Sequence, residues 1–368
     1  MIVTASDAPS FPGLVDLASA SLGGRALGCS DEFFAAAANL CKVEAAIFDP
    51  ERYTERGKWM DGWESRRRRS PGEDWCVLAL GVRGRVRAVD LDTSHFLGNH
   101  APFARLEGVD MGAGEATLEA LADASWRPLL EQSPLRAGSH NCFTLAGEEA
   151  ITHLRLTITP DGGVARLRAF GEVAAAPSSW PAPDDVAQVQ AQLDPAARDL
   201  AALRNGGRAL ACSDMFFAPM DNLIAPGRST FMGGGWETRR RRGPGHDWIL
   251  LRLAAPGRLD VIEVDTGHFH GNHAQRCALW GCFAPTARTT DLLVGNVSEG
   301  GWQEVLPQPA EAPRWRRIFG EHTLGPDRRE FIAALEDRGP FTHLRLETFP
   351  DGGVARLRAY GRAVEEGG

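Results

Sequence analysis

Two stretches of the chain decide its fold: THLRLTITPDGGVARLRAFG at residues 152–171 and THLRLETFPDGGVARLRAYG at residues 342–361. In the first, apolar side chains recur at every second position, at Leu154, Leu156 and Ile158, which is the period of a β-strand with one buried face. The PDGG segment that follows is a strong hairpin signal, because Asp-Gly readily forms a tight turn. We therefore expect two strands joined by a turn in each stretch, and a protein that is mostly β.

The same duplication extends along most of the chain. DLASASLGGRALGCSDEFF at 16–34 matches DLAALRNGGRALACSDMFF at 199–217, and VDLDTSHFLGNHAP at 89–102 matches IEVDTGHFHGNHAQ at 262–275. The spacing of the blocks gives the first copy ten extra residues between Asn39 and Trp63, and the second copy seventeen extra residues between its middle and last blocks. Each copy is far longer than a solenoid repeat, so we predict two domains, 1–175 and 197–368.

Residues 176–196 are predicted to form a linker between the domains. The run AAAPSSWPAPDD at 174–185 is rich in proline and alanine, and the residues after it have helix-forming composition up to Gly206 and Gly207. Within the second copy, WILLRLAAPGRLDVIEVDTGHF at 248–269 indicates two strands joined by a Pro-Gly turn. Short strands with regular turns favour a β-sandwich, so the predicted fold is all-β: two tandem jelly rolls joined by a linker and a short helix.

Composition and charge exclude several classes of protein. The chain has 368 residues and a formal net charge of -8, so we expect no nucleic-acid partner and no anionic membrane surface. No stretch approaches the roughly 18 apolar residues of a membrane span, and the first residues, MIVTASDAPSF, do not resemble a signal peptide. Seven cysteines without Cys-x-x-Cys spacing suggest neither a disulfide framework nor a zinc knuckle, which makes the cytoplasm the expected location.

An unusual run of four arginines occurs in both copies, in WMDGWESRRRRSPGEDW at 59–75 and FMGGGWETRRRRGPGHDW at 231–248. On a strand, alternate side chains share a face, so Glu237, Arg239 and Arg241 would lie together. A buried arginine requires a carboxylate, either from a side chain or from a bound anion. Two interpretations stay open: a solvated ladder of charges paired with glutamate, or an anion-binding strand. The candidate anion-binding residues are Glu64, Arg66, Arg68, Glu237, Arg239 and Arg241.

A second shared motif, D-T-x-H-F-x-G-N-H, supplies candidates for proton transfer. A carboxylate and an imidazole three residues apart can act as acid and base, because histidine titrates near neutrality. The asparagine offers both a donor and an acceptor. The alternative is that the aspartate caps a turn and the histidine contacts a loop carbonyl. The candidate residues are Asp92, His95, Asn99 and His100 in the first copy and Asp265, His268, Asn272 and His273 in the second.

The second copy also gathers His268, His270 and His273, which makes a divalent metal a further hypothesis, since two histidines at alternate strand positions point the same way. The first copy has Leu97 in place of the middle histidine, which weakens this hypothesis. No metal ligands are therefore predicted, and no cofactor is firmly implied.

Together, GGWETRRRR…HDW, DTGHFHGN and FPDGGVARLRAYG resemble the repeat signatures of the allantoicase family, from about Asp16 to Tyr360. This resemblance implies a tandem pair of galactose-binding-like jelly rolls that assembles into a homo-oligomer. It implies hydrolysis of the small molecule allantoate to ureidoglycolate and urea, in the breakdown of purines through allantoin.

The resemblance also implies roles for the candidate residues. The aspartates and histidines would be catalytic: Asp92, His95, His100, Asp265, His268 and His273. The glutamates, arginines and asparagines would bind the substrate: Glu64, Arg66, Arg68, Asn99, Glu237, Arg239, Arg241 and Asn272. The copies differ at MDGWES against GGGWET and at Leu97 against His270, so unequal activity of the two domains is one expectation. The alternative function is a tandem carbohydrate-binding module without catalysis, because galactose-binding-like jelly rolls often only bind sugars.

Overall fold

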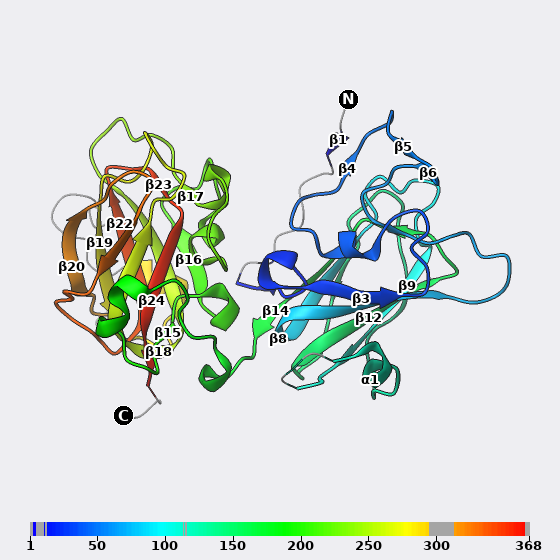
Figure 1. Ribbon diagram of the computed structural model, residues 1–368, viewed down its shortest axis with the longest axis horizontal. Coiled ribbons are helices and arrows are strands. Elements are labelled where there is room, and N and C mark those ends of the chain that lie inside the picture. Colours follow the sequence, from blue (N-terminus) through cyan, green and yellow to red (C-terminus); the bar gives the residue numbers. More distant parts are fainter. Residues whose placement is uncertain are drawn as a thin grey trace. The chain divides into compact units, whose positions relative to one another are not determined.

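The computed structural model describes residues 3–4, 11, 13–112, 114, 116–293 and 313–364. Most of the first eleven residues and the last four, where no targeting signal is predicted, lie outside the described residues. The chain divides into two compact units, Met1–Ala175 and Ala176–Gly368 (Figure 1). Among the described residues, no helix is long and apolar enough to cross a membrane.

The first unit is built around one long strand, β8 (Asp74–Asp92). The first part of β8 lies between β12 and β3, and its last part lies between β14 and β11, so the strand belongs to two layers. The first layer has the order β10-β9-β12-β8-β3 and the second the order β11-β8-β14-β2. The other main strands are β2 (Val15–Asp16), β3 (Arg25–Cys29), β9 (Phe103–Val109), β10 (Arg127–Pro134), β11 (Cys142–Thr144), β12 (Ile151–Thr159) and β14 (Arg166–Val173).

The second unit repeats this topology around β18 (Asp247–Asp265), with layers β20-β19-β22-β18-β16 and β21-β18-β24-β15. The predicted tandem of all-β sandwiches is therefore confirmed. Its other main strands are β15 (Arg198–Asp199), β16 (Arg208–Cys212), β19 (Arg276–Cys282), β20 (Arg316–Thr323), β21 (Arg329–Ile332), β22 (Phe341–Phe349) and β24 (Arg356–Ala363). The only α-helices among the described residues are α1 (Leu118–Ala122) and α2 (Thr289–Leu293).

Short elements decorate these sandwiches. The first unit has strands β1 (Val3–Thr4), β4 (Ile47–Phe48), β5 (Tyr53–Thr54), β6 (Gly57–Lys58), β7 (Trp63–Glu64) and β13 (Gly163–Val164), with 3-10 helices η1 (Ala20–Leu22) and η2 (Ala37–Cys41). The second unit has strands β17 (Trp236–Glu237) and β23 (Gly353–Val354), with 3-10 helices η3 (Pro177–Ser179), η4 (Ala187–Gln192), η5 (Leu203–Asn205), η6 (Met220–Ile224) and η7 (Met232–Gly234). In the first unit, β4, β5 and β6 all fall within the part of the chain that holds the ten extra residues.

Two predicted turns were wrong, and in both cases the long central strand of the unit is the reason. The PDGG segment does not close a hairpin between β12 and β14, because both strands pair with β8 rather than with each other. The turn leads instead into β13, which pairs with β7. Similarly, Pro256 and Gly257 do not form a turn between two strands, because they lie within the single strand β18 at the point where its neighbours change.

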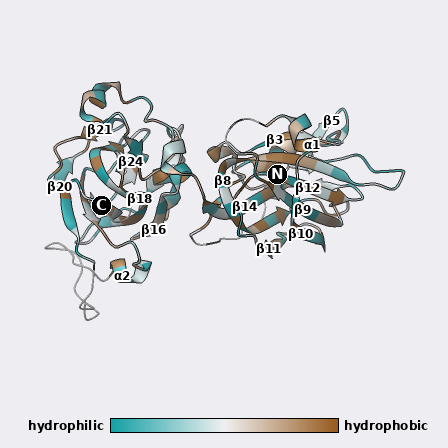
Figure 2. Cartoon of the chain, turned by 90° about the horizontal axis from the view of Figure 1, so that it is seen from below, coloured by the Kyte–Doolittle hydropathy of each residue, from teal (hydrophilic) through white to brown (hydrophobic). Residues whose placement is uncertain are grey.

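The alternation predicted for residues 152–171 is confirmed. Leu154, Leu156 and Ile158 of β12 are fully buried, as are their counterparts Leu344 and Leu346 of β22. Apolar and hydrophilic stretches are interleaved along the strands of both units (Figure 2). Each unit therefore buries its own core between its two layers.

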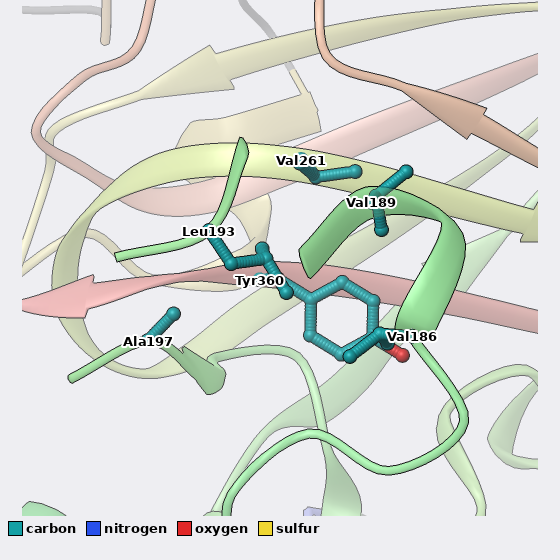
Figure 3. Close-up of a cluster of buried hydrophobic side chains, with 6 residues drawn as sticks. All are labelled: Val186, Val189, Leu193, Ala197, Val261 and Tyr360. Atoms are coloured by element: carbon teal, nitrogen blue, oxygen red, sulfur yellow. The ribbon is translucent and has the colours of Figure 1, made fainter. Parts of the chain in front are cut away.

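The segment predicted to be a linker, 176–196, groups with the second unit. It holds no continuous helix, but its 3-10 helix η4 carries Val189 at a buried position. Val186, Val189 and Leu193 pack with Val261 of β18 and Tyr360 of β24 (Figure 3). This part of the segment is therefore attached to the second sandwich by a hydrophobic contact.

Replacing Leu193 by alanine is expected to lower the free energy of unfolding of the second unit by about 2–4 kcal/mol, because the buried leucine leaves a cavity over Val261 and Tyr360. The neighbouring exposed Gln192 is the matched control, and Gln192→Ala should change stability by less than about 0.5 kcal/mol. Denaturant unfolding measures both. Equal, small effects would mean that the segment is only a loose connection.

Candidate functional site

Each copy of the D-T-x-H-F motif forms a tight turn directly after the long strand. Asp92 ends β8, is buried, and accepts a hydrogen bond from the backbone N–H of Ser94 at 2.8 Å. His95 follows with a φ of 69°, a left-handed backbone conformation that residues other than glycine rarely adopt. In the second unit Asp265 accepts from Gly267 N–H at 2.7 Å, and His268 has a φ of 70°. The aspartates therefore hold the turn that orients the histidines.

A buried carboxylate faces this turn in both units. Glu64 of β7 accepts a hydrogen bond at Oε1 from Asn99 Nδ2 at 2.7 Å, and Glu237 of β17 accepts one from Asn272 Nδ2 at 2.6 Å. β7 is fixed in place by its pairing with β13, which is why the PDGG turn matters for the site. Burial raises the pKa of the Glu64 carboxyl, and the hydrogen bond from Asn99 offsets part of this rise.

In the first unit these groups line a pocket of about 530 Å³. The imidazole of His95 stacks on Phe48, with ring centroids 5.8 Å apart, and its Nε2 lies 3.1 Å from the carbonyl oxygen of Ala46. Phe48 and Ala46 belong to the segment between Asn39 and Trp63, which also holds the ten extra residues, so this segment of the first copy builds one wall. The lining residues are Phe34, Phe48, Lys58, Met60, Glu64, Ser94, His95, Leu97, Gly98, Asn99 and Gly138.

The second unit arranges the same groups differently. His268 Nε2 contacts the carbonyl oxygen of Ser229 at 2.9 Å, as His95 contacts Ala46. However, the thioether of Met232 lies 3.2 Å from Asn272 Nδ2, beside the Glu237 carboxylate that the same amide contacts. A methionine side chain therefore lies against the amide of the second carboxylate–amide pair.

The arginine runs do not form the predicted strands, because β7 ends at Glu64 and β17 at Glu237. Arg66 pairs with Asp31, and Arg239 pairs with Asp214 in the same way, both at 2.7 Å through Nε.

The next alternate arginines also have protein partners. Arg68 Nη2 contacts Asp74 at 2.9 Å, and Arg241 contacts Asp247. The backbone N–H groups of Arg68 and Arg241 donate to the aspartates of the PDGG turns, Asp161 and Asp351. None of the four arginines lines the pocket of the first unit.

The last histidine of the motif also lies outside the pocket lining. His100 forms an isolated β-bridge with Gly163, and its Nδ1 is buried without a hydrogen-bond partner among the described residues. His273 bridges Gly353 and its Nδ1 contacts the carbonyl oxygen of His270 at 2.9 Å. The catalytic role predicted for both histidines stays a prediction.

The described part of the chain contains no cluster of three or more His, Cys, Asp or Glu side chains suited to a metal ion. His268, His270 and His273 do not lie on a strand, because β18 ends at Asp265. His268 contacts Ser229, and the His270 imidazole lies 4.0 Å from Asp327. These residues do not fit the hypothesis of a metal site.

Comparison with known proteins identifies the family of this chain. A family model described as "Allantoicase repeat" matches residues 15–174 and 198–364. The chain belongs to the allantoicase family. It is 40% identical over 355 residues to a "Probable allantoicase" of Pseudomonas fluorescens (strain Pf0-1). This match covers 96% of this chain and 98% of that protein. It is 39% identical to a "Probable allantoicase" of Photobacterium profundum, over 96% and 97% of the two chains.

Solved structures agree with this assignment. The crystal structure of allantoicase from Saccharomyces cerevisiae superposes with a TM-score of 0.73 at 31% identity, covering 95% of this chain and 94% of that chain. A second structure of allantoicase gives a TM-score of 0.72 with the same coverage. Both of these similarities span the two allantoicase repeats rather than a single one.

Sequence reasoning found three pocket residues, Glu64, His95 and Asn99, because the duplicated motifs contain them. It missed Phe48, Lys58 and Met60, which also line the pocket. These residues lie in the segment where the two allantoicase repeats differ in length, so a search for shared motifs passes over them. The ten extra residues of the first repeat are themselves the signal that could have found them.

Proposed function

We propose that this chain hydrolyses allantoate to ureidoglycolate and urea in the pocket of its first repeat. One observation carries the proposal: in a chain of the allantoicase family, a buried carboxylate, an amide and an imidazole line a single pocket. A volume of about 530 Å³ suits a small molecule. Homologues named allantoicase at about 40% identity support the choice of reaction.

The reaction requires one proton to be accepted and one to be donated. The bond between the central carbon and one ureido nitrogen breaks, urea leaves with an added proton, and water adds to the central carbon with loss of a proton. The lone pair of the remaining ureido nitrogen assists the departure of urea. General acid and base groups of this kind contribute about 10²–10⁴-fold each to the rate.

Glu64 and His95 are the residues we assign to these proton transfers. The Glu64 carboxylate accepts the proton of the attacking water, and Asn99 holds that carboxylate through Oε1. The His95 imidazolium donates to the leaving nitrogen through Nδ1, because its Nε2 is held by the carbonyl of Ala46. Asn99 also retains its amide oxygen to accept from a ureido N–H.

The other sequence candidates enter the proposal with different weight. Asp92 and Asp265 position the histidine turns through backbone contacts. Arg66 and Arg68 stay predicted substrate ligands, although each already has an aspartate partner. A homo-oligomer and a cytoplasmic location are further parts of the proposal.

The decisive experiment measures urea released from allantoate by the purified protein, with and without a chelator. Urea release that the chelator leaves unchanged is the expected result, because the pocket lining supplies one imidazole and one carboxylate, fewer than the roughly three protein ligands usual at a catalytic metal. If allantoate yields no urea and sugars stabilise the protein against heat, the chain is a carbohydrate-binding module instead.

The pH dependence of kcat/KM follows from the burial of Glu64. Since burial raises the pKa of this carboxyl above the ordinary glutamate value of 4.5, the base is protonated and inactive over a wider acidic range. We expect the acidic limb of the kcat/KM profile to have its midpoint above 4.5. Asn99→Ala should move this limb to still higher pH, because it removes the hydrogen bond that lowers the pKa. A limb at or below 4.5 in both proteins would remove Glu64 from the role of base.

A further inference from the structure

The two lysines of this chain are distributed in an informative way. Lys42 and Lys58 are the only lysines among its 40 basic residues, and both lie in the first repeat between Ala37 and Trp63. Lys42 Nζ forms an ion pair with Asp61 at 2.8 Å. Lys58 lines the pocket and has no carboxylate partner among the residues that the structure describes.

The surroundings of Lys58 leave its charge available. Its ammonium nitrogen lies 5.0 Å from the ring centroid of Phe48 and 5.5 Å from that of Tyr53. Aromatic faces hold a cation through their quadrupole without neutralising it. The β5–β6 hairpin positions the side chain, through the pairing of Tyr53 with Lys58 itself. The lysine is therefore held at the pocket by contacts that a bound anion does not have to break.

The predicted anion-binding arginines Arg66 and Arg68 and the buried Arg166 are already paired with carboxylates. Arg66 lies against Asp31, Arg68 against Asp74, and the buried Arg166 against Asp61. Across the lining of the pocket, Lys58 is the one permanently cationic side chain, and Phe34, Met60 and Leu97 add apolar wall. A carboxylate entering the pocket therefore meets one cationic side chain in the lining.

We propose that Lys58 binds the carboxylate of the substrate, and that the insertion of the first repeat serves to bring this lysine to the pocket. The proposal rests on the proposed hydrolysis of allantoate. The second repeat lacks the ten residues and contains no lysine, and Met232 lies against its carboxylate–amide pair. Catalysis is then confined to the first repeat.

The test compares Lys58→Gln with three other variants. Lys58→Gln should raise the KM for allantoate about 10- to 100-fold, the loss typical of a charged hydrogen bond, with a smaller change in kcat. Lys58→Arg should keep part of the affinity, because it keeps the charge. Arg52→Gln is the matched control, because Arg52 belongs to the same insertion but lies over Trp59, outside the lining of the pocket. The KM of this variant for allantoate should stay within about twofold of the wild-type value. Arg66→Gln tests the rival carboxylate ligand.

A binding measurement separates this proposal from the reaction itself. In a Glu64→Gln background, the Kd for allantoate should rise about 10- to 100-fold on adding Lys58→Gln, whereas the Kd for the neutral carboxamide analogue of allantoate should not change. If wild-type protein releases urea but Lys58→Gln leaves both constants unchanged, the role of Lys58 is wrong while the hydrolysis stands. If allantoate binds through Lys58 without releasing urea, the hydrolysis is wrong and the carboxylate site stands. A loss confined to Arg66→Gln overturns the proposal.

Discussion

Glu64→Gln is expected to lower the rate of urea release from allantoate by about 10²–10⁴-fold, with little change in stability. Glutamine has the same shape as glutamate and can still accept the hydrogen bond from Asn99, but it cannot take a proton from water. The comparison uses kcat for the wild-type and variant proteins, with far-ultraviolet circular dichroism and thermal unfolding to show that the fold is retained.

Glu237→Gln in the second repeat is the matched control for this result. Glu237 has the same contact, from Asn272 at 2.6 Å, and a similar degree of burial, so the structural effect of the two substitutions is the same. Because Met232 lies against Asn272 and no lysine is available, we expect Glu237→Gln to leave kcat within about twofold. Equal losses from the two substitutions would show that both repeats contribute to turnover.

Asp61→Ala should lower the free energy of unfolding of the first unit by about 3 kcal/mol, the lower end of the range for breaking a buried ion pair. Asp61 is buried and accepts from Arg166 at 2.7 Å, from Lys42 at 2.8 Å and from the backbone N–H of Ile47 at 3.1 Å. Its loss leaves a fully buried guanidinium without a counter-ion.

We expect a loss of stability at the lower end of this range because Arg166 also donates hydrogen bonds to the backbone carbonyl oxygens of Glu44, Asp61 and Ala165. These three hydrogen bonds remain after Asp61→Ala. The second repeat has Gly234 in place of Asp61, and within the part of the chain that the structure describes its Arg356 donates only to carbonyl oxygens, including that of Gly234. Burial lowers the pKa of Arg356 to about 10, and the nearby charge of Arg358 adds to this lowering.

Denaturant unfolding checks the effect of Asp61→Ala, with Glu51→Ala as control. Glu51 is exposed in the same insertion, so its loss should matter by less than about 0.5 kcal/mol. The contacts of Asp61 lower its pKa, so its stabilising effect is present above the ordinary aspartate value of 3.8 and is lost as the pH falls below it. A variant as stable as the control would mean that Arg166 needs no counter-ion.

The sequence predicted well the features that depend on short, periodic patterns of residues. The alternation at Leu154, Leu156 and Ile158 identified a buried strand face, and duplicated blocks identified two sandwiches. What it predicted poorly depends on pairing between distant segments. The PDGG turn has the composition of a hairpin, but β8 lies between the strands on either side of it, and no local pattern carries that information.

The candidate site divides in the same way. Glu64, His95 and Asn99 were found because both repeats carry them, and the fold brings Glu64 of β7 next to the loop that holds His95 and Asn99. The arginine runs were expected on strands, with anion binding as one of two interpretations, whereas Asp31 and Asp74 lie beside Arg66 and Arg68. Asp31 is far from Arg66 in the chain, so its role as partner could not be read from the sequence.

The long strand shared by both layers has a consequence for how these domains evolve. Since the backbone of β8 runs through both layers of the first unit, neither layer can detach or be rebuilt without disturbing the other, and each sandwich should behave as a single cooperative block. Variation is then tolerated mainly in the loops at the rim. After the gene segment was duplicated, such a loop could acquire new chemistry in one half while the framework of both halves stayed unchanged.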